Sequence, residues 1–306
     1  MSRRVLLTGG NGFVGSHILR QLLDRGFSVC CTIRTQAKGE KILNDFATQQ
    51  SQIDVTIVPN IVEPEAYDAV FRDSSFDTVF HTASPFTYVS GATAETNNLQ
   101  FLEPAIKGTL NLLHAVKNHA PTVKRIIWTG SCASVVDYDC LVSDPPRVYD
   151  ENDWNPISWD EAVNGEQSKA YRASKKFAEL EAWAFMKNEK PHFDLVTLCP
   201  PATFGPLRHS ISSIQDLNES NARLWKACFD SSKDAPVPYI PVHTYVDVQG
   251  QRTPLGKPGT SSLPPGAYSI DNAKVKAVLG VEFRSLEETV LDVARCLLGI
   301  ERIEKA

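Results

Sequence analysis

The sequence predicts an α/β fold whose centre is a doubly wound parallel sheet. Through about residue 200, short apolar, β-branched segments alternate with longer segments of helical spacing. The short segments are almost continuously apolar, as is typical of parallel strands covered by helices on both faces. A glycine-rich segment, TGGNGFVG from Thr8 to Gly15, directly follows the first of them. These three observations together favour repeated strand–helix–strand units.

Each expected element follows from its local pattern. The segments expected to form strands are 4–8, 28–33, 53–58, 76–81, 125–130 and 194–199. The segments expected to form helices between them are 13–25, 37–49, 63–72, 95–119 and 162–188. Pro121 and Pro191 lie just beyond the last two helices, where a proline ends helical structure.

The pattern changes after residue 200, where prolines become dense and only 216–230 and 285–299 keep long helical spacing. We therefore expect two domains. Residues 1–200 form a nucleotide-binding domain, with 238–250 returning to its sheet. Residues 201–306 form a smaller, loop-rich, substrate-binding lobe over the ligand crevice of the sheet.

The composition is that of an ordinary soluble globular protein. Of 306 residues, 42% are hydrophobic and 22% charged, and the net charge is −5 without a long run of like charges. This argues against nucleic acid and anionic membranes as partners. No apolar stretch reaches the length of a membrane span or resembles a signal peptide, and the seven cysteines are scattered, so we expect a cytoplasmic protein with reduced thiols.

The glycine cluster predicts a dinucleotide site of Rossmann type. Gly9, Gly12 and Gly15 allow a tight turn and a close approach of a pyrophosphate to the start of the following helix. The second strand ends in Arg34, where NAD-binding proteins usually carry an acidic residue, and Lys38 and Lys41 follow. A guanidinium at this position favours the 2′-phosphate of NADP(H), although a surface arginine is the simpler alternative.

Two further features predict acid–base chemistry. Tyr171 and Lys175 are four residues apart on one helical face, and a lysine cation can stabilise the phenolate of a tyrosine near neutral pH. Ser131 follows the strand 125–130 and can hydrogen-bond a substrate carbonyl, with Ser134 as a rival for this role. His81 lacks partners at ligand or triad spacing, so we expect it to be structural and expect no metal site.

Taken together, these motifs resemble the extended short-chain dehydrogenase/reductase family, and within it the branch of dihydroflavonol reductase, cinnamoyl-CoA reductase and the fungal aldehyde and methylglyoxal reductases. The resemblance covers residues 1 to about 247. Its motifs are TGGNGFVG, Arg34, VFHTASP at 79–85, PAIKGTLNLL at 104–113, WTGSCASV at 128–135, YRASK at 171–175, LCPPATFGP at 198–206 and TYVDV ending at Val248.

The resemblance implies a role for each matching residue. Tyr171 is the proton donor, Lys175 modulates it and binds a ribose, Ser131 anchors the carbonyl, and Arg34 with Lys41 holds the 2′-phosphate. The implied pyrophosphate loop consists of Thr8, Gly9, Gly12, Phe13, Val14 and Gly15. The residues implied to face the nicotinamide, besides Tyr171 and Lys175, are Ala83, Ser84 and the stretch 199–202 with Pro200.

Two departures from the family pattern concern cofactor affinity and completeness. Asn60, beside Ile61 at the adenine end, stands where this branch usually has an aspartate, which should reduce the affinity for the cofactor without abolishing it. After about residue 248 the chain runs into GQRTPLGKPGTSSLPPG, where the family has a further helix and strand. Several tens of residues are therefore expected to be missing before the pattern resumes at Tyr268.

The function predicted from these residues is an NADPH-dependent oxidoreductase acting on the CH–OH group, which reduces an aldehyde or ketone to an alcohol. A nucleotide-sugar epimerase or dehydratase is one alternative, and a catalytically impaired NADP-binding paralogue is another. Apolar and aromatic residues in 86–89, 136–141 and 206–225 favour a small hydrophobic carbonyl substrate. The oligomeric state is expected to be a monomer or homodimer.

Overall fold

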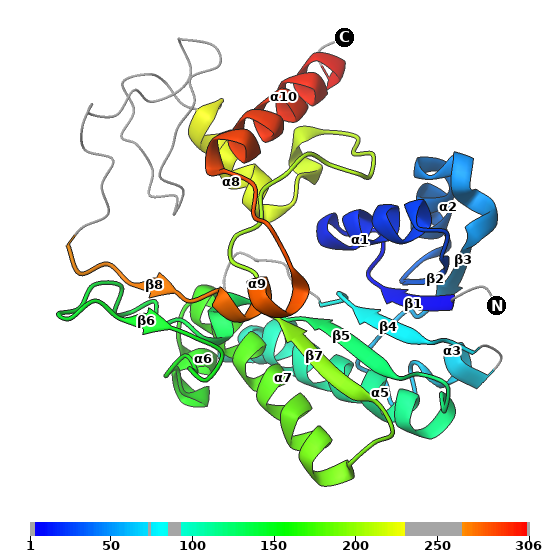
Figure 1. Ribbon diagram of the computed structural model, residues 1–306, viewed down its shortest axis with the longest axis horizontal. Helices are drawn as coiled ribbons and strands as arrows, with labels where there is room; N and C mark the ends of the chain where they lie inside the picture. The colour runs from blue at the N-terminus through cyan, green and yellow to red at the C-terminus, as the bar shows by residue number, and fades with distance from the viewer. Residues whose placement is uncertain (1–3, 73–74, 85–92, 230–264, 305–306) are drawn as a thin grey trace. The chain divides into compact units, whose positions relative to one another are not determined.

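The computed structural model describes residues 4–72, 75–84, 93–229 and 265–304 (Figure 1). The chain divides into two compact units. The first consists of Met1–Asp139 and Glu151–Pro201, and the second of Cys140–Asp150 and Ala202–Ala306. The segment 238–250, which the sequence analysis returns to the sheet, lies outside the described residues.

A six-stranded parallel sheet with the order β3-β2-β1-β4-β5-β7 forms the centre of the first unit. Its strands are β1 (Arg4–Thr8), β2 (Ser28–Ile33), β3 (Ile53–Ile57), β4 (Thr78–His81), β5 (Arg125–Thr129) and β7 (Asp194–Leu198). The order reverses direction next to β1, as in the Rossmann fold. The predicted fold class, a doubly wound parallel sheet, is confirmed, and each expected strand is present with small shifts at its ends.

The helices cover both faces of this sheet, because successive strand residues point to opposite sides. On one face α1 (Phe13–Asp24) and α2 (Gln36–Asp45) pack against Val5 and Leu7. On the other face α3 (Asp68–Arg72), α5 (Glu103–His119) and α7 (Gln167–Glu189) pack against Leu6. Figure 1 shows these two layers above and below the strands. The continuous apolar character of β1 is thereby explained.

Cover is less complete at β7. Leu195 is buried in the core beneath α5 and α7, whereas Val196 is partly buried and Leu198 is 37% exposed. Among the described residues β7 pairs with β5 alone. A Rossmann strand of this kind is usually covered on both faces.

Two long helices expected from the sequence are interrupted. The segment 95–119 contains α4 (Ala94–Asn97), the π-helical turn η2 (Asn98–Leu102) and then α5. The segment 162–188 contains α6 (Trp159–Asn164) and then α7. The two breaks are linked by Asn97, whose buried side-chain amide donates to the backbone oxygens of Val163 and Gly165 at 2.9 and 2.8 Å and so ties the end of α4 to the end of α6.

Shorter elements complete the first unit. Helix α3 begins at Asp68, later than expected, and the end of the segment 37–49 belongs to a 3₁₀ turn, η1 (Ala47–Gln52). A second 3₁₀ turn, η3 (Cys132–Ser134), follows β5.

The second unit has its own small core. Helices α8 (Glu219–Cys228) and α10 (Leu286–Glu304) contribute Leu224, Val293 and Leu297 to it. The other elements of this unit are the 3₁₀ turn η4 (Ile214–Asp216), α9 (Ala273–Leu279), and the two-stranded sheet of β6 (Val148–Tyr149) and β8 (Ser269–Ile270).

A buried hydrogen-bond cluster joins the carboxyl ends of β1 and β4. The hydroxyl oxygen of Thr8 accepts hydrogen bonds from the backbone N–H groups of Thr82 and Ala83, both at 3.1 Å. Because both lone pairs are used, we infer that its proton is donated to Nδ1 of His81, 2.7 Å away. Burial, and then the charge of Lys175, lower the pKa of His81 to about 3, so the ring stays neutral.

We expect His81 to make the fold sensitive to acid. Its folded-state pKa of about 3 lies below the ordinary value of 6.5, so the unfolded chain binds the extra proton between these values. The stability contributed by the neutral ring is complete above about pH 6.5 and is lost progressively as the pH falls toward 3. Urea unfolding of the wild type and His81→Asn at pH 7.5, 6.5 and 5.5 measures this effect. Equal pH slopes for both proteins would contradict it.

Candidate active site

The turn between β1 and α1 brings two backbone segments into direct contact. The N–H of Gly12 donates to the carbonyl oxygen of Gly9 at 3.0 Å, and Gly9 has a φ of 72°, which favours glycine. A Cβ on Gly15 would lie only 2.1 Å from the same oxygen. Helix α1 therefore begins directly against the turn, and Gly12 gives it no side-chain cap. This leaves its first N–H groups oriented as in anion-binding helix termini.

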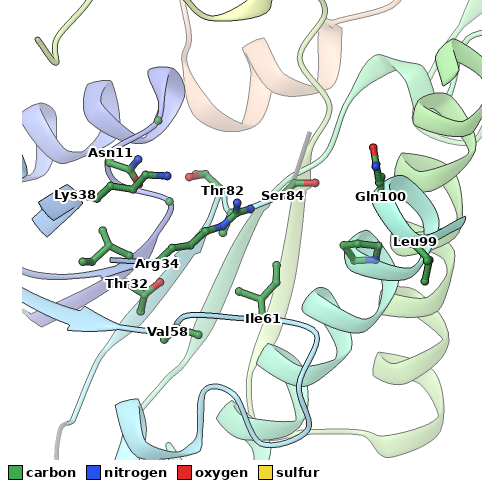
Figure 2. A pocket seen from close by; sticks show the side chains of 15 residues that line it. Asn11, Thr32, Arg34, Lys38, Val58, Ile61, Thr82, Ser84, Leu99 and Gln100 are labelled. Atoms are coloured by element: carbon green, nitrogen blue, oxygen red, sulfur yellow. The ribbon is translucent and has the colours of Figure 1, made fainter. Parts of the chain in front are cut away.

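A cavity of about 570 Å³ opens beside this turn (Figure 2). It lies at the carboxyl edge of the sheet, where β1, β2 and β4 end. Its lining consists of Gly9, Asn11, Gly12, Thr32, Ile33, Arg34, Lys38, Val58, Ile61, Thr82, Ala83, Ser84, Leu99, Gln100 and Pro104. These described lining residues include two cations and no carboxylate. Figure 2 shows Arg34 extending across the cavity from the end of β2, with Lys38 beside Asn11.

A second cavity of about 400 Å³ shares Arg34, Ile61, Leu99 and Pro104 with the first. Its other lining residues are Pro59, Asn60, Val62 and Glu103. The side chain of Asn60 is held in place, because its oxygen accepts from the N–H of Val62 at 3.1 Å and its amide donates to Glu63 at 2.9 Å. A mostly apolar space, a cationic group beside it and an open helix start fit the adenine, 2′-phosphate and pyrophosphate of NADPH.

The structure gives different positions to the two lysines after Arg34. Lys38 lines the first cavity, whereas Lys41, one turn later on α2, is not among the residues lining either cavity. Sequence reasoning noted both lysines, but it assigned Lys41, together with Arg34, to the 2′-phosphate. The position of Lys38 in the first turn of α2 was the available signal. A residue near the start of a helix that follows a strand remains near the edge of the sheet.

Several further lining residues were not assigned to the site from the sequence, among them Thr32, Leu99 and Gln100. Thr32 lies near the end of β2, where small polar residues are common. Leu99 and Gln100 lie in the π-helical turn η2, which widens the helix and turns them toward the cavity. Hydrophobic periodicity of 3.6 residues does not reveal such a turn.

The pair Tyr171 and Lys175 lies on α7 and reaches the cavity wall through Ser84. Lys175 is 8% exposed, its Nζ lies 5.6 Å from the centre of the Tyr171 ring, and it donates to Oγ of Ser84 at 2.8 Å. Ser84 itself lines the cavity. Burial lowers the pKa of Lys175 to about 8, so the amine is mostly charged at neutral pH.

The two candidate serines have different surroundings. Ser131 is partly exposed and caps η3, where its oxygen accepts from the N–H of Ala133 at 3.2 Å. Its own hydroxyl proton is not used in that bond. Ser134 is fully buried, with its hydroxyl 2.9 Å from Oε2 of Glu179. The geometry therefore favours Ser131 over Ser134 as the group that meets a substrate.

Several other predicted site residues are not among those that line the cavities. Thr8 is buried beneath the turn, Gly15 packs on that turn, and the carbonyl oxygen of Pro200 accepts from the N–H of Cys132 at 3.0 Å. Phe13 and Val14 begin α1, and the Phe13 ring packs edge-on against His17. Their roles as cofactor ligands stay predictions, as do those of Ser131, Tyr171 and Lys175.

Two kinds of feature are lacking in the part of the chain that the structure describes. No group of three or more His, Cys, Asp or Glu residues there is arranged to hold a metal ion. In the same part of the chain, no helix combines the length and apolar character needed to cross a membrane.

Comparison with known proteins identifies the family. The sequence matches the NAD dependent epimerase/dehydratase family over residues 5–219, which include the glycine turn, both cavities and the Tyr171–Lys175 pair. The chain belongs to this family. The resemblance to the extended short-chain dehydrogenase/reductase family is thereby confirmed.

Members of the epimerase/dehydratase family that are similar to this chain include named fungal reductases. Ketoreductase azaE of Aspergillus niger is 36% identical over 97% of this chain and 98% of its own length. NADPH-dependent methylglyoxal reductase GRE2 of Saccharomyces cerevisiae is 30% identical over 97% of this chain and 98% of its own length. The crystal structure of yeast methylglyoxal/isovaleraldehyde reductase Gre2 complexed with NADPH superimposes with a TM-score of 0.82 at 28% identity, covering 97% of this chain and 99% of Gre2.

This family member is shorter than its relatives. The alignment with azaE runs over 344 positions, which is 38 more than the 306 residues of this chain, so at least that number of positions lack a counterpart here. By contrast, the alignment with an uncharacterised Schizosaccharomyces pombe oxidoreductase covers 80% of this chain in 248 positions, so the aligned part of this chain has almost no gaps in it.

We expect Lys38 rather than Lys41 to contribute to the preference for NADPH. Lys38→Ala should raise the KM for NADPH about tenfold, as for the loss of one charge-assisted hydrogen bond, and leave the KM for NADH unchanged. Arg34→Ala should have a larger effect in the same direction. Lys41→Ala is the matched control on the same helix. Steady-state kinetics with both cofactors measure these changes, and a larger effect of Lys41→Ala would restore the assignment made from the sequence.

Proposed function

We propose that this protein is an NADPH-dependent carbonyl reductase that converts an aldehyde or ketone to an alcohol. One observation carries the proposal: Ser84, in the wall of the cofactor cavity, accepts a hydrogen bond from Lys175, whose ammonium group faces the Tyr171 ring. An acid–base pair thus adjoins a cavity suited to NADPH.

In this proposal the chain positions the carbonyl group and supplies its proton. Ser131 donates its hydroxyl hydrogen bond to the carbonyl oxygen, and Tyr171 transfers a proton to the same oxygen as negative charge develops there. Lys175 stabilises the phenolate that Tyr171 leaves behind. Bound NADPH supplies the hydride.

The substrate class follows from the relatives and from the sequence. The named relatives are a ketoreductase and reductases of methylglyoxal and isovaleraldehyde, and we extend this class of small carbonyl compounds to the present chain. The apolar residues near the expected pocket favour a hydrophobic member of the class. We further propose that the protein acts in the cytoplasm as a monomer or homodimer.

A nucleotide-sugar epimerase or dehydratase fits less well. Enzymes of that type usually retain NAD, whereas the cavity has Arg34 and Lys38 and, among its described lining residues, no carboxylate that would bind both ribose hydroxyls. Finding NAD in the purified protein would revive this alternative.

A catalytically impaired paralogue is favoured by one observation, the shorter chain. We propose that the residues without a counterpart fall after about residue 248, and the 37% exposure of Leu198 on β7 is consistent with lost cover there. Saturable NADPH binding without turnover across aldehydes, diketones and aryl ketones would support impairment. NADPH consumption with any of them would exclude it.

Tyr171→Phe tests the proton donor. Because the substitution removes only the hydroxyl, we expect kcat for NADPH-linked reduction to fall about 10²- to 10⁴-fold while NADPH binding is retained. Tyr67→Phe is the matched control, since its buried hydroxyl has no hydrogen-bond partner among the described residues. If Tyr171→Phe keeps most of the wild-type rate, the assignment of Tyr171 as the proton donor is wrong.

The pKa of Lys175 predicts a pH dependence. Its ammonium loses the proton as the pH rises through about 8, and with it the charge that stabilises the phenolate. We therefore expect kcat/KM for NADPH, which reports the free enzyme, to decline above about pH 8. The decline of kcat should come at higher pH, because bound phosphates favour the charged amine. A kcat/KM profile that stays flat to pH 10 would contradict this account.

A further inference from the structure

A buried carboxylate, that of Glu179, connects the helix that carries Tyr171 and Lys175 to the turn that follows Ser131. Glu179 is on α7, two helical turns after Tyr171 and one after Lys175, and it is only 5% exposed. The three residues therefore lie along one side of the same helix. An acidic side chain at such depth costs free energy unless it accepts strong hydrogen bonds.

The partners of Glu179 come from the segments on which Ser131 depends. Its Oε2 accepts from the hydroxyl of Ser134 at 2.9 Å and from the thiol of Cys199 at 3.4 Å. A Cβ on Gly130 would lie 3.3 Å from the same oxygen, so the backbone before Ser131 rests almost directly on the carboxylate. Glu179 thus contacts the residue on the amino side of Ser131 and the end of the turn that follows it.

The thiol of Cys199 is suited to be a donor in this cluster. Burial, and then the charge of Glu179, raise the pKa of Cys199 to about 12, so the thiol keeps its proton at neutral pH. Cys199 directly follows β7, and the backbone oxygens of Leu198 and Pro200 on either side of it accept from Gly130 and Cys132 at 2.8 and 3.0 Å. The same strand end therefore holds the serine turn through both backbone and side chain.

The hydroxyl of Ser134 links the carboxylate to Ser131 itself. Its single proton lies within reach of two acceptors, Oε2 of Glu179 at 2.9 Å and the carbonyl oxygen of Ser131 at 2.8 Å. With the carboxylate present, the hydroxyl group is held between α7 and the backbone of Ser131. Without it, the hydroxyl keeps the Ser131 carbonyl oxygen and the Sγ of Cys199, 3.8 Å away, as neighbours, and this hydrogen bond between the turn and α7 is lost.

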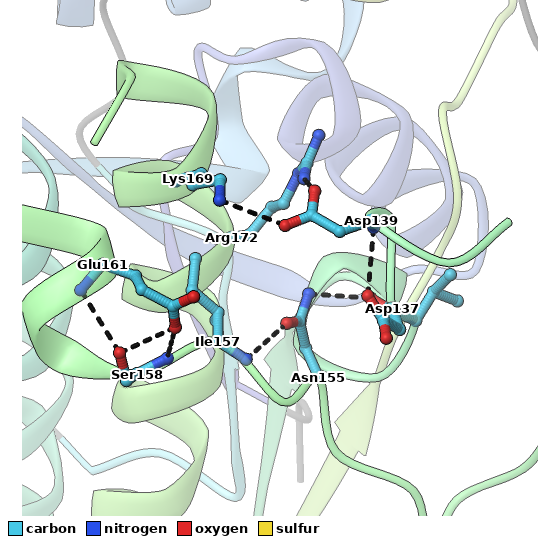
Figure 3. A network of polar contacts seen from close by, with 9 residues as sticks. Asp137, Asp139, Asn155, Ile157, Ser158, Glu161, Lys169 and Arg172 are labelled. Atoms are coloured by element: carbon cyan, nitrogen blue, oxygen red, sulfur yellow. Dashed lines mark hydrogen bonds and ion pairs between the residues drawn. The ribbon is translucent and has the colours of Figure 1, made fainter.

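A second clamp holds the turn from another direction. The side-chain amide of Asn155 donates to the backbone oxygens of Ala133 and Val136 at 3.1 and 2.7 Å. Its oxygen accepts from the N–H of Ile157 at 2.9 Å (Figure 3). Because both of its amide hydrogen bonds go to the backbone of the turn, Asn155 fixes the shape of the turn. It lies before α6 and α7 and is not part of either helix. Glu179 differs because it connects the turn to the helix that carries Tyr171.

We propose that Glu179 is a positioning residue of the reductase, which sets the placement of the Ser131 hydroxyl relative to Tyr171 through hydrogen bonds to Ser134 and Cys199. This inference rests on the proposed function. Glu179 does not touch the reacting atoms. Its effect passes through the serine turn, because displacement of one hydrogen-bonding group by about 1 Å is enough to reduce a rate substantially.

The test compares two substitutions at this position. Glu179→Met keeps the approximate size of the side chain and removes both acceptor oxygens, whereas Glu179→Gln keeps one. We expect Glu179→Met to lower kcat roughly 10- to 100-fold and Glu179→Gln to recover most of the loss, with the KM for NADPH nearly unchanged in both. Glu181→Gln, exposed on the same helix, is the control. Substitution of a buried charge by an apolar side chain often preserves folding, and Ser134→Ala provides a milder second variant with the same expected direction.

A double-mutant cycle with Ser131→Ala separates positioning from general structural support. If Glu179 acts through Ser131, Glu179→Met should have little further effect on kcat in the Ser131→Ala background. Equal factors in both backgrounds, a wild-type kcat in Glu179→Met, or a proportional loss of NADPH binding would each overturn the proposal. Failure of the wild type to consume NADPH with any carbonyl would instead overturn the proposed function.

Discussion

The candidate site depends on the hydrogen bonds by which Thr8 joins the ends of two neighbouring parallel strands. Its hydroxyl accepts from Thr82 and Ala83 and contacts His81, so the glycine turn after β1 and the segment after β4 are fixed to each other at one buried atom. From there the connection continues, because Ser84 follows directly and accepts from Lys175. The cavity and the proposed acid–base pair, Tyr171 and Lys175, thus have a common support.

The cationic side chains of this site have two kinds of surroundings, exposed and buried. Arg34 and Lys38 lie at an open cavity where water and a phosphate can reach them, which suits groups that attract an anion from solution. Lys175 is enclosed, and burial already lowers its pKa to about 8. Burial raises the free energy of the charged form of Lys175, so a nearby negative charge stabilises that form strongly. In the proposed reaction, a developing phenolate on Tyr171 provides this charge.

Local patterns allowed the sheet, the glycine turn and the Tyr171–Lys175 pair to be predicted, because each depends on residues close together in sequence. The parts that were missed depend on context. The π-helical turn of Leu99 and Gln100 breaks the expected period. The sequence assigned Ser131 with Ser134 as a rival, and only the burial of Ser134 in the fold adds support for that assignment. The contact of Glu179 with Ser134 joins residues far apart in the chain, so a single sequence carries no sign of it.

In the proposed reductase, the residues assigned to the pyrophosphate and those assigned to the preference for NADPH belong to different elements. The contact of Gly15 with Gly9 leaves no space for a side chain, so the turn between β1 and α1 tolerates little change. Arg34 and Lys38, in contrast, stand at the end of β2 and the start of α2, with side chains directed into open space. Evolution or design can therefore alter cofactor preference by replacing two surface residues, while the turn and the chemistry of α7 stay untouched.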